Sequence, residues 1–242
     1  YINNDLSLDS TEIDFISCLI LISPFIIGIS WDELAHIDIG NERLKYLFSF
    51  GFYDHFDYRD HRFYPGLYNT LSGLVIKMFP KKYEIEILHL TNLVFSILTI
   101  FGISKISNEL FNKKVGKIVF LLCFLNPVFF GQMSMNPKDT IIAFAHVWST
   151  YIFLRYLKNQ NRKDKCNRHI LLGGLAIGVG TGMRLPFLIT LIPLFFFAII
   201  DIFFFKKIIS KEFSLKKFII HLIVILLIAY LVTISFWPHA HK

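Results

Sequence analysis

Long apolar runs alternate with short polar segments along most of this 242-residue chain. Several runs come close to, or exceed, the length of about 20 residues with which a helix crosses a bilayer. They are residues 13–30, 85–104, 115–131, 139–157, 170–183, 185–205 and 218–236. The pattern predicts an all-α integral membrane protein with about seven transmembrane helices over residues 13–236. Residues 1–12 precede this domain and residues 237–242 begin a further segment.

The one long polar interruption, residues 31–84, contains two stretches of helical periodicity. Apolar residues recur every three or four positions over 34–47 and again over 67–78, with polar residues between them. Amphipathic helices of this kind lie along a membrane surface instead of crossing the membrane. We therefore expect interfacial helices in this loop.

The formal net charge of +7 is concentrated in short segments between apolar runs. Lys and Arg dominate residues 105–117, 155–169 and 206–217, which are alternate loops of the predicted topology. Cytoplasmic loops carry such an excess of basic residues. The charge thus predicts a multi-pass protein of the cell membrane, with a cytoplasmic N-terminus and an outward 31–84 loop. Because topology accounts for the charge, we expect no nucleic-acid partner.

Composition supports the membrane class, since 54% of the residues are hydrophobic and 27 are Phe. A soluble domain of this size needs far less apolar material for one core. The outward segments contain no cysteine, so no disulfide framework is expected. The sequence has no initiator Met and stops where the last apolar run ends, so we expect a fragment of a longer protein.

Two acids and a histidine follow the first apolar run directly, in the stretch SWDELAH. One interpretation is a capping box, in which Ser30 caps the first turn of a helix, Glu33 reaches back and Asp32 favours the helix dipole. The other is chemical, with a carboxylate that takes a proton from an acceptor hydroxyl or amine. His36 lies one turn after Asp32 and either orients it, binds a ligand or is polar surface. Both interpretations stay open.

The segment YDHFDYRDHR, later in the same loop, mixes carboxylates, imidazoles and guanidinium groups. Such side chains are able to bind a divalent cation, but their spacing matches no fixed metal motif. The alternative is a solvated loop in which Arg59 and Arg62 pair with the acids, and Arg62 is also a candidate substrate contact. The possible metal ligands are Asp54, His55, Asp57, Asp60 and His61.

Two shorter outward segments carry further charges. In NPKDT, Asp139 either caps the helix that follows or stands with Lys138 at a site for a charged lipid headgroup. In GMRLPF, Arg184 is either an interfacial anchor or a bidentate ligand for phosphate. The outward segments therefore combine acids and bases on one side of the membrane.

The apolar runs themselves hold few ionisable groups. We expect His146 and His221 to face neighbouring helices instead of forming a proton relay. A transporter or flippase of lipid-linked substrates usually has polar groups and broken helices near the midplane. The Gly-rich run 173–182 is the feature that favours this alternative. A non-catalytic scaffold, with WDE and NPKD as helix caps alone, is a third possibility.

Three motifs, in their order along the chain, resemble one enzyme family. WDE after the first span, then NPKDTIIAFAHVWSTYIFLRYLK and GLAIGVGTGMRLPFL, resemble the membrane glycosyltransferases of the C-type fold, family 39. This group includes protein O-mannosyltransferases and lipid A aminoarabinose transferases. The resemblance runs from about residue 13 to 236 and is strongest to the bacterial branch, which implies a bacterial inner membrane with an outward site.

The resemblance also implies roles for individual residues. Asp32 corresponds to the catalytic base with Glu33 beside it, and Asp139 corresponds to a second acid in or near the site. Arg184 stands where relatives commonly have the Lys of a Lys-Gly-Pro element that contacts the lipid phosphate. The stretch HRFYPGL keeps only part of a His-Pro-Pro-Leu-like element, so no role is carried over to His61.

The implied reaction is inverting transfer of a sugar from a polyprenyl-phosphate carrier to a hydroxyl or amine of a lipid, glycan or protein. Asp32 would take the acceptor proton, while Arg184 and Lys138 would hold the leaving phosphate. His36 and Arg62 are further candidate substrate contacts. The sequence has no Gly-rich nucleotide loop, and the reaction needs no cofactor and requires no metal. The expected partners are the lipid-linked donor, the acceptor and membrane lipid.

Overall fold

The computed structural model describes residues 22–53, 64–135, 137–210, 212–237 and 240, and these residues form helices, turns and loops without a strand. The all-α prediction is therefore confirmed for this part of the chain. Residues 22–26 are helical. The other elements are α2 (Glu33–Phe48), α3 (Leu67–Lys77), η2 (Lys81–Tyr83), α4 (Glu84–Leu110), α5 (Lys113–Phe124), α6 (Pro127–Gln132), α7 (Pro137–Asn159), α8 (Lys163–Met183), α9 (Phe187–Thr190), α10 (Ile192–Ile200), η3 (Asp201–Phe205) and α11 (Leu215–Ser235).

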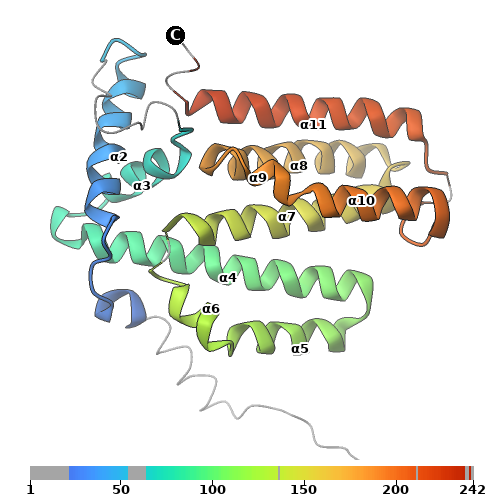
Figure 1. The fold of residues 1–242 in the computed structure, drawn as a ribbon, viewed down its shortest axis with the longest axis horizontal. Helices are drawn as coiled ribbons and strands as arrows, with labels where there is room; N and C mark the ends of the chain where they lie inside the picture. The colour runs from blue at the N-terminus through green and yellow to red at the C-terminus, as the bar shows by residue number, and fades with distance from the viewer. Residues whose placement is uncertain (1–21, 54–63, 136, 211, 238–239, 241–242) are drawn as a thin grey trace, which may run out of the picture.

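The long helices lie side by side in the packing order α11, α8, α7, α4 and α5 (Figure 1). Helices α2 and α3 pack against each other and stand across one end of this array. The largest apolar core joins α7, α8, α10 and α11, with Tyr156, Leu157 and Leu191 almost completely buried. Chain segments that are distant in sequence therefore meet at the end of the bundle that α2 and α3 cover.

Three helical segments are long and apolar enough to cross a membrane, namely Lys81–Leu110, Phe187–Phe205 and Leu215–Ser235. They contain or overlap three of the predicted spans. Helices α7 and α8, with 23 and 21 residues, have the length but fall short in apolar character. The predicted total of about seven spans is therefore not confirmed by the described residues.

The predicted span 115–131 is broken into two helices. Asn126 accepts a hydrogen bond from the Phe129 amide at 2.9 Å and so begins α6, with Pro127 at its first position. An Asn followed by Pro favours a new helix start over continuation of the old one. The 12 residues of α5 extend only about 18 Å. One straight span over 115–131 is therefore wrong.

The Gly-rich run lies in one uninterrupted helix, α8. A Cβ added to Gly174 would approach Ile228 Cβ to 2.6 Å, and one added to Gly178 would approach Val232 Cβ to 2.6 Å. These glycines therefore let α8 pack closely on α11, as small residues four apart do in membrane helices. The broken helix that would have favoured a transporter is absent from this described segment.

Polar side chains on the long helices bond to neighbouring helices. His221 Nδ1 lies 2.9 Å from the Tyr156 hydroxyl, and His146 Nδ1 lies 3.2 Å from the Thr190 hydroxyl. Both histidines thus face their neighbours, as expected for polar groups inside a helix bundle.

Helices α2 and α3 confirm the helical periodicity of the long loop, and their place at a membrane surface stays a prediction. They cross where Gly40 meets Gly73, since a Cβ on Gly40 would lie 2.7 Å from the Asn69 carbonyl oxygen and 3.3 Å from Gly73 Cα. This close approach fixes the direction of α2 and so places Asp32 and Glu33 at the end of the bundle.

Candidate functional site at the end of the bundle

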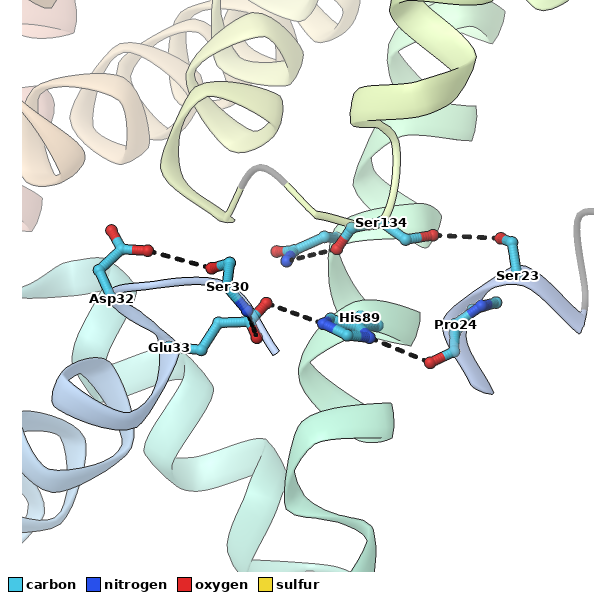
Figure 2. A network of polar contacts seen from close by, with 8 residues as sticks. Ser23, Pro24, Ser30, Asp32, Glu33, His89 and Ser134 are labelled. Carbon is cyan, nitrogen blue, oxygen red and sulfur yellow. Dashed lines mark hydrogen bonds and ion pairs between the residues drawn. The ribbon is translucent and has the colours of Figure 1, made fainter. Parts of the chain in front are cut away.

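Asp32 and Glu33 begin α2, and the first turn forms half of the expected capping box. The Glu33 carboxylate accepts a hydrogen bond from the Ser30 amide at 2.8 Å, which is the predicted reach-back contact. The Ser30 hydroxyl instead donates to Asp32 Oδ1 at 3.2 Å, and the Asp32 side chain makes no cap hydrogen bond. Figure 2 shows that the two carboxylates have different surroundings. Capping thus accounts for Glu33 and leaves Asp32 available for another role.

Glu33 and His89 form a completely buried polar pair (Figure 2). Glu33 Oε1 lies 2.8 Å from His89 Nε2, and His89 Nδ1 lies 3.0 Å from the Pro24 carbonyl oxygen. Because a carbonyl only accepts, Nδ1 must carry a proton and donate. The pair therefore connects the end of the first helix, the start of α2 and α4.

The Asp32 side chain is half exposed and contacts His36, with 3.2 Å between Oδ2 and Nε2. Partial burial raises the pKa of Asp32, but the charge of His36 and the Ser30 hydrogen bond outweigh it, so this pKa lies below its ordinary value. Burial and the charge of Lys138 lower the pKa of His36, although Asp32 opposes them. At neutral pH the pair is an ionised carboxylate beside a neutral imidazole that donates from Nε2.

Four buried polar side chains gather behind Asp32, between α2, α3 and α4. His36 and Tyr68 have ring centroids 5.2 Å apart at an interplanar angle of 79°. Among the described residues, His36 Nδ1, the Tyr68 hydroxyl, Asn69 Oδ1 and Asn92 Oδ1 make no short, well-aligned hydrogen bond, although Asn69 interacts with His36 and Asn92 with Tyr68. Burial and the charges of Glu33 and Asp32 raise the pKa of Tyr68, so its hydroxyl stays protonated. The wall behind Asp32 thus retains unused hydrogen-bonding capacity.

His36 is a candidate from the sequence, whereas Tyr68, Asn69 and Asn92 are not, although α4 carries a sequence signal for Asn92. Polar residues recur on this apolar helix at helical spacing, and all are buried: His89, Asn92, Ser96 and Thr99. Two of them anchor the segment before α7, where the Asn92 amide donates to the Ser134 carbonyl and the Ser96 hydroxyl donates to the Met133 carbonyl. A polar stripe at this spacing marks the helix face that meets polar neighbours.

A second charged group lies at the same end, where α7 begins and α8 ends. Arg184 Nη1 and Asp139 Oδ1 are 3.7 Å apart, and both side chains are more than half exposed. Lys138 interacts electrostatically with Arg184, Asp139 and Asp32, and its charge also acts on His36. The structure therefore brings together all predicted site residues except Arg62, which lies outside the described residues.

Arg43 is a further buried cation that the sequence analysis missed. Its guanidinium donates to the Phe236 carbonyl at 3.3 Å and to the Tyr64 carbonyl at 3.1 Å. Burial lowers the pKa of Arg43 to about 10, so the group stays charged at neutral pH. Arg43 thus connects α2 to the end of α11 and to Tyr64, which precedes α3.

Among the described residues, no group of three or more His, Cys, Asp or Glu side chains is placed to hold a metal ion. The acid and histidine residues proposed as ligands, Asp54 to His61, lie outside the described residues.

The chain matches one family model, described as dolichyl-phosphate-mannose-protein mannosyltransferase, over residues 67–237. Searches of curated proteins and of solved structures found no match. The matched range covers α3 to α11 and includes Lys138, Asp139 and Arg184, while Asp32 and Glu33 precede it. Since the match extends over more than half of the sequence, the chain belongs to the dolichyl-phosphate-mannose-protein mannosyltransferase family.

Proposed function

We propose that this membrane glycosyltransferase moves a sugar from a polyprenyl-phosphate carrier to an acceptor hydroxyl or amine at the outer face of the membrane. Family membership supports the reaction class. The observation that carries the assignment of the site is the position of Asp32. Its half-exposed carboxylate shares one end of the bundle with the Lys138 and Arg184 cations.

Asp32 acts as the general base in this proposal. It takes the proton of the acceptor while the acceptor atom bonds to the anomeric carbon, and the bond from that carbon to the phosphate oxygen breaks. The polyprenyl phosphate leaves with the electron pair of that bond, and a single displacement inverts the anomeric configuration. A carboxylate whose pKa lies below its ordinary value is ionised and ready to accept a proton.

Arg184 and Lys138 hold the phosphate of the donor. A guanidinium binds two phosphate oxygens at once, and an ammonium adds a point charge. The exposed Asp139 carboxylate lies 3.7 Å from Arg184, close enough to orient the guanidinium without neutralising both cations. We assign Asp139 to positioning of Arg184, and His36 to orientation of Asp32.

Glu33 has a positioning role and does not transfer the proton. Its side chain has no exposed surface, and both carboxylate oxygens accept hydrogen bonds, from the Ser30 amide and from His89. An acceptor substrate therefore reaches Asp32 and not Glu33. From the sequence, Asp32, Glu33 and Asp139 are all catalytic candidates, and this assignment gives Glu33 a positioning role instead.

The test is a transfer assay on the full-length protein in membranes, with radiolabelled polyprenyl-phosphate sugars and several donors. Asp32→Asn keeps size and polarity but removes the base, and we expect it to lower label transfer by about 100-fold or more. Asp38→Asn is the matched control, since Asp38 is an exposed acid on the same helix. Equal activity of Asp32→Asn and wild type would show that another group is the base.

A further inference from the structure

A cavity lies away from Asp32, between α7 and α8, which pack side by side (Figure 1). Its volume is about 510 Å³, within the range of about 300–1,000 Å³ that ligand sites occupy. The lining residues come only from these two helices. We call this cavity the α7–α8 groove.

Both walls of the groove follow helical periodicity. On α7, the lining residues Phe144, Trp148, Tyr151 and Arg155 are spaced by three or four, and so occupy one face. The lining residues on α8 follow the same spacing and also occupy one face, namely Lys165, Arg168, His169, Leu172, Leu175, Ala176 and Val179. Because the two helices are antiparallel, the end of α7 meets the start of α8. The cations of both faces therefore gather at one end, and apolar residues line the rest.

Every charged side chain that lines the groove is cationic. Arg155 is compensated, since its Nη1 lies 3.0 Å from the Glu109 carboxylate that Lys158 also contacts. Lys165 and Arg168 are exposed, and no described carboxylate lies within ion-pair distance of either. The groove end thus carries positive charge in excess, and it is open to an anion.

The apolar part has the dimensions of an acyl chain. From Phe144 to Arg155, the α7 wall rises about 16 Å, close to the depth of about 15 Å that one leaflet of hydrocarbon occupies. Trp148 lies tilted against Phe144 and edge to face with Tyr151, with ring centroids 6.2 and 5.7 Å apart, and the three rings form an aromatic wall. On the α8 wall, Leu172 and Leu175 are 36% and 40% exposed, so apolar surface is left uncovered there.

We infer that the α7–α8 groove binds an anionic glycerophospholipid. Its phosphate would contact Arg168 and Lys165, and one acyl chain would cover Trp148 and the α8 leucines. Basic pockets between membrane helices bind anionic headgroups in this way. A polyprenyl phosphate would also offer an anion to these cations, but the proposed transfer needs its phosphate at Lys138 and Arg184, at the opposite end of α7 and α8. The position of the groove cations therefore favours the phospholipid, and the site is separate from the proposed transfer reaction.

Tryptophan fluorescence tests the inference directly. The sequence has three Trp, and replacement by Phe of Trp31, Trp237 and any Trp of the full-length protein outside this sequence leaves Trp148 in the groove as the reporter. The full-length protein is reconstituted in phosphatidylcholine vesicles with rising fractions of phosphatidylglycerol brominated on its acyl chains. We expect half-maximal quenching at a much lower fraction for this lipid than for brominated phosphatidylcholine.

Two double variants separate the groove from general surface charge. Lys165→Gln with Arg168→Gln should raise the lipid fraction at half-maximal quenching about 10- to 30-fold, because each lost cation weakens binding about fivefold. Arg162→Gln with Lys163→Gln removes equal charge from the same region without touching the groove, and should leave the fraction unchanged. Equal loss in both variants would overturn the inference, as would equal quenching by both lipids. Displacement of the brominated phosphatidylglycerol from the unaltered groove by polyprenyl phosphate would assign the groove to the donor chain instead.

Discussion

At the residue scale, the two neighbouring acids at the start of α2 differ because their side chains leave the helix in different directions. Asp32 is half exposed and has a neutral imidazole beside it, while Glu33 is completely buried against His89. A proton acceptor needs access to substrate, and an anchoring group needs partners. The surroundings of each side chain therefore give each acid a separate role, although the two residues are neighbours in the sequence.

The pH dependence of transfer tests the contact between Asp32 and His36. His36 takes up a proton as the pH falls, and its charge then lowers the pKa of Asp32. Activity should therefore persist at acidic pH until Asp32 is protonated below its ordinary pKa. In His36→Phe, the pKa of Asp32 rises, so the acid limb of the kcat/KM profile should move to higher pH. Asp38→Asn should leave the limb in place. An unchanged limb in His36→Phe would show that His36 does not act on the base.

Stability tests the buried pair of Glu33 and His89. His89→Phe keeps a large ring but leaves a buried carboxylate without its side-chain partner, which costs about 3–5 kcal/mol. For a chain of this size, thermal unfolding should occur on the order of 10 °C lower.

The double variant His89→Phe with Glu33→Gln should recover part of this loss, because a neutral amide is cheaper to bury than an unpaired charge. Glu42→Gln is the control, since its pair with Lys45 lies on the surface, and it should unfold like wild type. An unchanged unfolding temperature in His89→Phe would mean that the pair does not anchor the start of α2.

At the element scale, glycines decide where helices approach most closely. The crossing of α2 and α3 at Gly40 and Gly73 and the packing of α8 on α11 both leave no room for a Cβ. The sequence could predict α2 and α3 as helices from their periodicity. It could not predict their crossing point, because a glycine in a helix has the same local pattern whether or not another backbone touches it.

Substitution at the α2–α3 crossing tests this packing. Gly40→Ala would place its Cβ 2.7 Å from the backbone oxygen of Asn69, so one helix must shift. We expect a loss of about 1–3 kcal/mol in unfolding free energy and reduced transfer, since α2 carries Asp32. Gly131→Ala in α6 meets nothing within 4 Å, and should not lower the stability. Equal stability of both variants would contradict the close crossing.

At the scale of the whole molecule, the predicted topology places the two ends of the bundle on opposite sides of the membrane. The candidate site lies where α7 begins and α8 ends, while the basic residues of the α7–α8 groove lie at the other end of the same helices. The positive-inside rule then predicts that the site faces outward.

Labelling of single cysteines with an impermeant maleimide in intact cells tests this orientation. The background replaces Cys18, Cys123, Cys166 and any cysteine of the full-length protein outside this sequence by Ser. Lys45→Cys on α2 should react from outside, whereas Lys163→Cys at the start of α8 should react only after the membrane is opened. The reverse pattern would place the site on the cytoplasmic face and rule out transfer at the outer surface.

The sequence by itself determined the helical class, the membrane character and the family likeness, because these depend on local periodicity, hydropathy and short motifs. Its site residues stay a prediction. It predicted one span over 115–131 where the structure has α5 and α6, since a run of apolar residues does not reveal the helix break at Asn126. Only the tertiary structure decided that Glu33 is buried against His89 and that Tyr68, Asn69 and Asn92 stand behind Asp32. These groups come from helices far apart in the chain, and their contacts depend on how the backbones cross.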